Sequence, residues 1–124
     1  WRGQEPEIVW QAAAEMRDAA RPEPLWLIDV NREQRRIRLR PAAPYPLNAM
    51  QVHELWALPA NGTAPVSLGL LPQRDIVERP LSEYQYAALL TASKLAVSRE
   101  PAGGSPTGAP TGPVVVVVDI RQVT

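Results

Sequence analysis

The chain has 124 residues, no cysteine, and 13 basic and 13 acidic side chains, so its formal net charge is zero. The missing cysteines exclude disulfides and cysteine-based zinc sites. A neutral charge balance argues against nucleic-acid binding, which needs a surplus of positive charge on one face. No run of residues approaches the roughly 20 apolar positions of a membrane span, and the length predicts one domain.

Short strands are predicted along the first two thirds of the chain. Residues 1–7 are expected to form an extended lead-in. Residues 36–40 (RIRLR) alternate strictly, with Ile37 and Leu39 on one face and three arginines on the other, which indicates a half-buried strand. A solvated arginine face is expected, and binding of an acidic ligand is the alternative. Further strands are expected at residues 8–16, 25–30, 50–58, 66–71 and 75–79, with turns at 21–24, 31–34 and 61–62. In the first of these strands the alanine run favours helix, the preceding IVW favours strand, and strand is the prediction.

The periodicity changes after residue 80. Ser82 and Gln85 have the spacing of a capping box, and Leu81 and Tyr86 have that of a hydrophobic staple. These pairs predict a short helix over about residues 83–92. Strands are expected to follow at residues 94–99 and 114–123.

The last of these strands contains five consecutive valines, residues 114–118. A continuous apolar run is typical of a strand that is covered on both faces. Because hairpin-like connections outnumber crossovers, the sheets are expected to be antiparallel. The predicted fold class is mainly β, an antiparallel β-sandwich of about seven or eight short strands with one short helix at about 83–92.

Residues 99–113 (REPAGGSPTGAPTGP) form the most unusual segment, with four of the seven glycines and four of the fourteen prolines. Such a composition is typical of a flexible linker. Here, however, one predicted strand precedes it and another follows it. We therefore expect a structural loop of the fold, with glycines at positions of positive φ and prolines that stiffen the chain between them.

The residues that could carry chemistry lack suitable partners in the sequence. His53 is the only histidine, and the strand pattern places it opposite Val52 and Trp56 as a partly exposed side chain. The serines lie in no nucleophile motif. The tryptophans of the predicted strands are expected in the core, and a carbohydrate-stacking platform is the alternative. They are Trp10, Trp26 and Trp56.

Glu54 stands out because it shares the predicted inward face of its strand with Val52, Trp56 and Leu58. A buried carboxylate is costly unless it is paired or hydrogen-bonded. One hypothesis is a catalytic acid, which would need a second carboxylate nearby. The favoured hypothesis is a strut that accepts backbone N–H groups of the glycine-rich loop, since those groups have no strand partner.

Three segments together carry a family resemblance. They are HELWALP (residues 53–59), PVSLGLLP (residues 65–72) and LAVSREPAGGSPTGAPTGP (residues 95–113). They resemble the C-terminal domain of the anti-sigma-K factor family, often called RskA-like. The resemblance is dense over residues 50–116. His53 stands where the family commonly has tyrosine and Arg99 where it commonly has leucine, and both are expected at the surface.

The resemblance marks a structural signature rather than a catalytic, cofactor or metal site. Its residues are Glu54, Trp56, Gly69, Glu100, Pro101, Gly103, Gly104, Pro106, Gly108, Pro110, Gly112 and Pro113.

The resemblance implies a non-enzymatic part of a single-pass membrane protein. A cytoplasmic N-terminal part, which is not in this chain, would bind an extracytoplasmic-function sigma factor and keep it from RNA polymerase. A transmembrane helix would precede residues 1–7, residues 8–124 would form one domain on the periplasmic side of the bacterial cytoplasmic membrane, and regulated proteolysis would release the sigma factor. The start at Trp1, without methionine, agrees with this expectation. No cofactor and no nucleic-acid partner are implied.

Two other hypotheses come from different classes of protein. A stand-alone periplasmic module that binds a ligand or carbohydrate would need at least two exposed, coplanar aromatic rings. A hydrolase built on Glu54 or His53 would need a pocket with convergent polar groups.

Overall fold

The computed structural model describes residues 9–121, which form eight strands and one helix. The elements are β1 (Gln11–Met16), β2 (Trp26–Asn31), β3 (Arg36–Pro41), β4 (Gln51–Pro59), β5 (Val66–Leu70), β6 (Val77–Pro80), α1 (Glu83–Thr91), β7 (Ala92–Pro101) and β8 (Val114–Asp119). The predicted fold class, mainly antiparallel β with one short helix, is confirmed. The expected lead-in at residues 1–7 lies outside the described residues.

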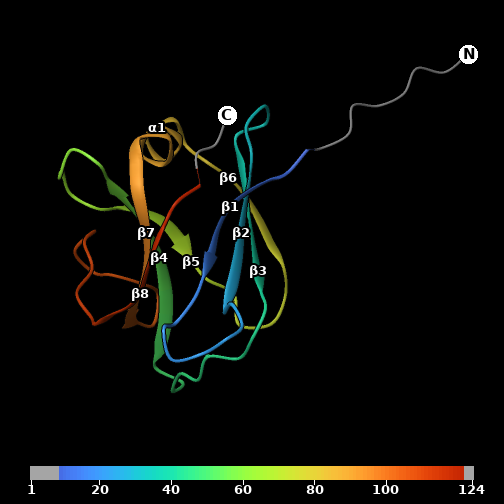
Figure 1. Ribbon diagram of the computed structural model, residues 1–124. Coiled ribbons are helices and arrows are strands. Elements are labelled where there is room, and N and C mark those ends of the chain that lie inside the picture. The colour runs from blue at the N-terminus through green and yellow to red at the C-terminus, as the bar shows by residue number, and fades with distance from the viewer. Residues whose placement is uncertain (1–8, 122–124) are drawn as a thin grey trace, which may run out of the picture.

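The strands form two four-stranded sheets, which are the two layers seen in Figure 1. The first sheet has the order β1-β2-β3-β6, and the second has the order β5-β4-β7-β8. Every pairing is antiparallel. The pairing of β4 with β7 extends from Gln51 opposite Pro101 to Pro59 opposite Ala92. These two strands are the central pair of the second sheet.

The core lies between the two sheets and is apolar. Ile37 and Leu39 of β3 are fully buried in it, which confirms the face predicted from the RIRLR alternation. Leu55 of β4 and Leu95 and Val97 of β7 contribute from the other side. Burial of this apolar surface is the main force that holds the two layers together.

The arginine face of β3 is less solvated than the sequence predicts. Arg38 and Arg40 donate Nε–H to Oδ2 of Asp29 at 3.1 and 2.8 Å, and Asp29 is only 4% exposed. Arg38 also lies over the ring of Trp10, 4.6 Å from its centroid. Since β3 lies between β2 and β6, these arginines stabilise the middle of a sheet and do not protect an edge.

The valine run was expected to be covered on both faces, and this expectation is wrong. β8 is the last strand of its sheet. Val116 is buried, whereas Val114 and Val117 are each 50% exposed. The register also shifts between Val97 and Ser98 of β7, so that Val116 and Val114 pair with consecutive residues. A run without polar residues hides which face is inward, and it does not distinguish an edge strand from a central one.

Helix α1 begins with the predicted capping box. The Ser82 hydroxyl accepts from the Gln85 N–H at 3.0 Å, and the Gln85 side-chain oxygen accepts from the Ser82 N–H at 3.0 Å. Leu81 and Tyr86 are 7% and 8% exposed, as residues of a hydrophobic staple should be. The helix connects β6 of the first sheet to β7 of the second.

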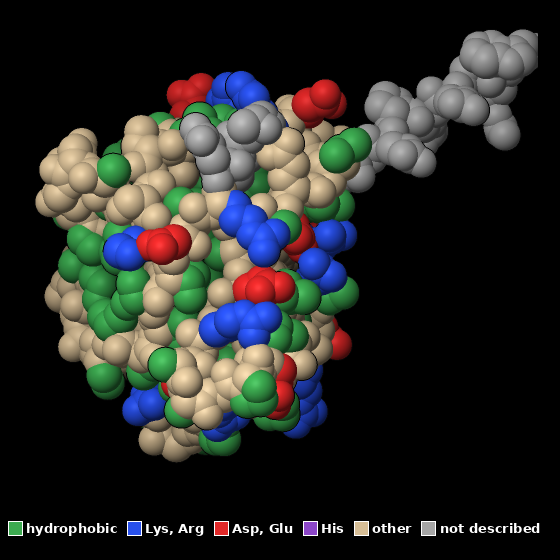
Figure 2. Space-filling view, viewed as in Figure 1, with side chains coloured by type: hydrophobic (Ala, Val, Ile, Leu, Met, Phe, Trp, Pro, Cys, Tyr) green, Lys and Arg blue, Asp and Glu red, His purple; other side chains and the backbone are tan. Residues whose placement is uncertain are grey.

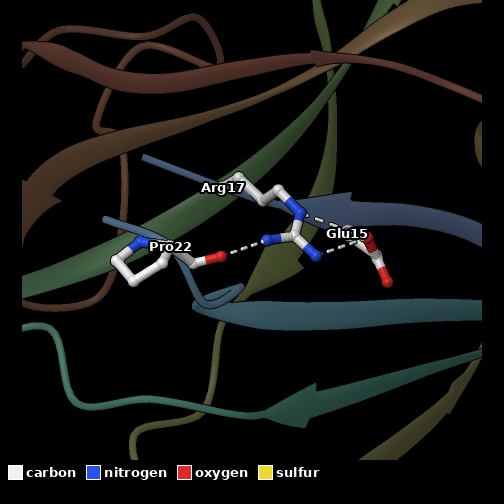
Figure 3. A network of polar contacts seen from close by, with 3 residues as sticks. All are labelled: Glu15, Arg17 and Pro22. Atoms are coloured by element: carbon white, nitrogen blue, oxygen red, sulfur yellow. Dashed lines mark hydrogen bonds and ion pairs between the residues drawn. The ribbon is translucent and has the colours of Figure 1, made fainter. Parts of the chain in front are cut away.

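Arg17 contributes two side-chain contacts to the connection between β1 and β2. Arg17 donates to the carboxylate of Glu15 at 2.9 Å and to the carbonyl of Pro22 at 2.6 Å (Figure 3). Its side chain thus ties the end of β1 to the turn that follows. This turn also contains Arg21, which contacts the connection between β3 and β4.

The surface carries no single sign of charge on the face shown in Figure 2, where basic and acidic side chains are interspersed. That pattern agrees with the zero net charge of the sequence. Within residues 9–121, the structure contains no helix with the length and apolarity needed to cross a membrane.

Candidate functional site

The site lies on the outer face of the second sheet, where the loop of residues 102–113 covers β4 and β7. This loop follows β7 and lies on the side of the sheet that faces away from the other layer (Figure 1). It carries most of the signature residues.

The two faces of β4 are reversed relative to the prediction. Leu55 and Ala57 belong to the core between the sheets, whereas Glu54 contacts the loop on the outer face. Trp56 is also fully buried. Because the loop covers the outer face, apolar and polar residues on both faces of β4 are buried, and the period of two could not show which face is inward.

Glu54 is a strut of the loop, as its favoured hypothesis predicts. Its Oε1 accepts the backbone N–H of Ser105 at 2.7 Å, and its Oε2 accepts the hydroxyl of Ser67 at 2.5 Å. The side chain is only 7% exposed. Ser67 in turn accepts the N–H of Gly69 at 3.1 Å. The carboxylate therefore links β4, β5 and the loop.

A second buried carboxylate, Glu100, holds the far end of the loop. Its oxygens accept the backbone N–H groups of Thr111 and Gly112 at 3.1 and 3.3 Å, and the Thr111 hydroxyl at 2.5 Å. The side chain is 1% exposed. Burial alone would raise the pKa of Glu100, but the hydrogen bonds from Ser98, Thr111 and Gly112 outweigh it and hold the pKa below its usual value. Glu100 is therefore a stable carboxylate and a poor proton donor.

Trp56 joins these polar contacts from the strand side. Its indole Nε1–H donates to the Ser98 hydroxyl at 2.8 Å, and that hydroxyl donates to Oε2 of Glu100 at 2.5 Å. The Trp56 and Ser98 donors therefore each have a buried acceptor. These hydrogen bonds fix the tryptophan and the loop relative to each other.

Three loop glycines occupy conformations that other residues adopt only with strain. Gly103, Gly104 and Gly108 have φ values of +90°, +98° and +79°. At Gly104 a Cβ atom would also lie 3.0 Å from Oε1 of Glu54. The expectation of positive φ is confirmed at these positions.

Gly112 is required for a different reason, so the positive-φ expectation is wrong there. A Cβ atom at this position would lie 1.7 Å from the carbonyl oxygen of Arg99. The loop crosses back over β7 here, and the Arg99 N–H donates to the carbonyl of Pro113 at 2.9 Å. Absence of a side chain, rather than backbone freedom, makes glycine necessary.

Gly69 serves a contact between the two sheets. Its φ is +106°, and a Cβ atom would lie 2.8 Å from the guanidinium of Arg79, which comes from β6. Nη2 of Arg79 donates to the carbonyl of Leu70 at 2.5 Å. This signature position therefore lies outside the loop and belongs to the junction between β5 and β6.

The prolines of the signature are distributed along the loop. The carbonyl of Pro101 accepts the Gly104 N–H at 2.9 Å, which closes a tight turn. Pro106 is exposed and Pro110 is half-buried. Each fixes its own φ, so the loop loses less conformational entropy on folding than a glycine-serine segment would.

His53 is not the partly exposed residue that the sequence predicts. It is 0% exposed and lies on the inner face of β4. Its ring stacks on Tyr45, with centroids 5.0 Å apart and planes at 17°, and meets Trp26 at 5.0 Å and 70°. Burial, and to a lesser degree the positive charge of Arg99, lowers the pKa of His53 to about 4. The reversal of β4 that exposes Glu54 to the loop brings His53 into the interior.

Trp10 and Trp26, the other tryptophans of the predicted strands, both pack against neighbouring residues. Trp26 is 2% exposed and donates Nε1–H to the carbonyl of Pro72 at 2.9 Å, and Trp10 is half-buried under Arg38. The expectation of a core position is therefore wrong for Trp10. The burial of Trp26 and Trp56 counts against a carbohydrate-stacking platform. The occupied, buried carboxylate of Glu54 likewise counts against a hydrolase built on it.

Sequence reasoning did not identify the hydroxyl partners of the two carboxylates. These are Ser67, Ser98 and Thr111. For Ser98 a signal existed, because Ser98 and Glu100 are two residues apart on one strand and so share a face. For Thr111 none existed, since its place depends on the path of the loop.

Other candidate sites are weaker. A cavity of about 760 Å³ is lined by residues of β1, the β2–β3 turn and α1, including Arg35 and Tyr86. Among residues 9–121, no group of three or more His, Asp and Glu side chains is placed to bind a metal ion.

A comparison with family models gives one match. The model described as "Anti-sigma-K factor rskA, C-terminal" matches residues 1–114, and these include every signature residue. Neither the search of curated proteins nor the search of solved structures gave a match.

Proposed function

The chain belongs to the family of anti-sigma-K factor C-terminal domains, and from this membership we propose that it is the extracytoplasmic regulatory domain of a single-pass membrane anti-sigma factor. The family is regulatory rather than enzymatic, and its partner is a sigma factor. The proposal adds three points to this: an extracytoplasmic-function sigma factor as the target, a position on the periplasmic side of the membrane, and release of the sigma factor by regulated proteolysis.

The family match over residues 1–114 carries the proposal. The site supports it, because Glu54 and Glu100 are used to hold a loop and are not presented to a cleft. In this role the domain acts through its shape and stability. An intact domain shields the upstream cleavage site from its protease, and a disturbed domain exposes it.

Co-purification of the full-length protein tests the proposal. We expect a sigma factor of the extracytoplasmic-function class to be recovered and identified by mass spectrometry. Deletion of the region that corresponds to this chain should leave that sigma factor bound, since the contact would be made by the cytoplasmic part. Recovery of no sigma factor would contradict the proposed target.

A second experiment tests the side of the membrane. A reporter enzyme that is active only outside the cytoplasm, fused to the C-terminus of the full-length protein, should be active. The same fusion should be inactive if the domain lies in the cytoplasm, and that result would contradict the proposed localisation.

A further inference from the structure

The most unusual group outside the signature network is the imidazole of His53. Its side chain is fully buried, and among residues 9–121 neither Nδ1 nor Nε2 has a hydrogen-bond partner. Buried polar atoms without partners are rare in folded proteins and cost free energy. An exception of this kind requires an explanation, and catalysis does not provide it here because the ring lies inside the core.

The surroundings of His53 suit a neutral ring. Tyr45 stacks on the imidazole, and the Trp26 and imidazole rings form a T-shaped contact with their planes at 70°. These rings come from the connection between β3 and β4 and from β2, and they offer apolar contact rather than hydrogen bonds to the imidazole. A protonated imidazole would lose its hydration here without gaining an acceptor.

The charged groups around this cluster are cationic. Arg99 of β7 is the cross-strand neighbour of His53, and Arg21 lies over the Tyr45 ring, 5.4 Å from its centroid. The adjacent carboxylates of β4 and β7, Glu54 and Glu100, point to the opposite face of the sheet and are bonded to the loop. Because Arg21 already places a positive charge at the Tyr45 ring, a second positive charge on the imidazole stacked against that ring is disfavoured.

The connection of residues 42–50 is the part that can yield. β4 is held by hydrogen bonds to both β5 and β7. The connection is held to the rest of the molecule by fewer bonds. Ala42 and Ala43 donate to the carbonyl of Leu25 at 2.8 and 3.3 Å, Arg21 donates to the carbonyl of Pro44 at 3.1 Å, and the carbonyl of Met50, at the end of the connection, accepts the Ala102 N–H at 3.0 Å. Protonation of the imidazole therefore displaces the connection rather than the strand.

We propose that His53 is an acid-operated latch, which holds the connection of residues 42–50 against the sheets while its imidazole is neutral and releases it when the imidazole is protonated. The chemical signal is the proton itself. The latch is a property of the domain alone. Its consequence, that acidification exposes the upstream cleavage site, rests on the proposed function.

The direction of the effect follows from the two protonation equilibria. The buried ring has a pKa of about 4 and an exposed histidine one of 6.5. Between these values the open state binds a proton that the closed state excludes, so the closed state weakens as the pH falls from 6.5 toward 4. From about pH 7.5 to about pH 5, the equilibrium constant for opening should rise by up to roughly 30-fold.

Hydrogen exchange of the 124-residue chain tests the latch. Protection factors of the Ala42 and Ala43 amides should fall by at least about tenfold between pH 7.5 and pH 5. The Leu81 amide, which donates to the carbonyl of Arg35 in another part of the molecule, should keep its protection. In H53F, where an apolar ring replaces the imidazole, the protection of Ala42 and Ala43 should be the same at both pH values.

Equal protection of Ala42 and Ala43 in the unsubstituted chain at both pH values would overturn the latch, as would an acid response that persists in H53F. Should H53F not fold, NMR titration of the single histidine decides the question. A pKa near 4 supports the latch, and an ordinary pKa near 6.5 refutes it.

A sigma-dependent reporter in cells with the full-length protein tests the link between the latch and the proposed function. An acid response of the reporter that H53F abolishes supports this link. A reporter that does not respond to acid refutes the link, while the exchange result still decides the latch.

Discussion

The two faces of the second sheet differ in how their buried polar side chains are hydrogen-bonded. On the outer face, Glu54 and Glu100 are buried with acceptor atoms that are occupied by hydroxyl and backbone N–H groups of the loop. On the inner face, His53 is buried among rings with neither nitrogen bonded within residues 9–121. Hydrogen-bonded carboxylates fix the loop in place on the outer face, whereas the unpaired imidazole on the inner face is the group that we propose responds to protonation.

Among variants that disturb either face, removal of the Glu100 carboxylate is expected to lower the free energy of unfolding most. E100A leaves the Ser98 hydroxyl and the N–H groups of Thr111 and Gly112 without an acceptor in a buried position. We expect a loss of about 4 kcal/mol in the free energy of unfolding. Urea unfolding followed by tryptophan fluorescence measures it. E33A, at an exposed acidic residue, is the control, and equal stability of the two variants would contradict the role of Glu100.

A side chain at Gly112 should lower the free energy of unfolding nearly as much. G112A places a methyl group 1.7 Å from the Arg99 carbonyl, so the loop must move away from β7. We expect about 3 kcal/mol of destabilisation. The matched variant is G108A, where φ is +79° but no atom lies near the added methyl, and about 1 kcal/mol is expected from the backbone alone. Thermal unfolding that ranks the two variants in the opposite order would show that the loop is not seated on β7.

A smaller effect is expected at Glu54. E54Q keeps one side-chain oxygen but loses the charge that strengthens the bonds from Ser67 and Ser105. We expect about 1–2 kcal/mol of destabilisation and a measurable decrease in Tm. An unchanged Tm would remove the strut interpretation.

The valines of β8 should show the smallest effects and the clearest asymmetry. V116A removes buried methyl groups and should cost about 1–2 kcal/mol, whereas V117A, at a position 50% exposed, should cost less than about 0.5 kcal/mol. Chemical denaturation measures both. Equal costs would mean that both sides of β8 are covered.

The pH ranges of the two faces also differ. The stability that Glu100 contributes is present above the ordinary carboxyl pKa of 4.5 and is lost as the pH falls below it toward the lowered value in the folded state. The contribution of neutral His53 is already lost between pH 6.5 and pH 4. The change in stability between about pH 7.5 and pH 5 therefore reports mainly on the inner face. E100Q should lower the stability at both pH values and leave the difference between them unaltered.

Much of the fold follows from local patterns in the sequence. The RIRLR strand, the capping box at Ser82 and Gln85, and the Asn61-Gly62 turn each depend on neighbouring residues, and each is confirmed. The faces of β4 and the position of β8 could not be predicted in this way. They depend on how the loop folds back over the sheet, and no local period carries that information.

The site was predictable to the same degree. That Glu54 would accept an N–H group of the loop followed from the cost of burying a carboxylate. The steric need for glycine at Gly112 did not, because it depends on the approach of Arg99, thirteen positions away along the chain. The burial of His53 was missed because the faces of β4 were predicted in reverse. Neighbouring residues of a strand point to opposite faces, so the strand that turns Glu54 outward turns His53 inward.

Hydrogen exchange at three loop amides tests the central claim most directly, namely that residues 102–113 form an ordered element pinned by two buried carboxylates. The amides of Ser105, Thr111 and Gly112 donate to Glu54 and Glu100 and should exchange at least about 100-fold more slowly than in an unfolded chain. In E54Q only Ser105 should lose most of its protection. Exchange of all three amides at the unfolded-chain rate would contradict the account, because the segment would then be a linker after all.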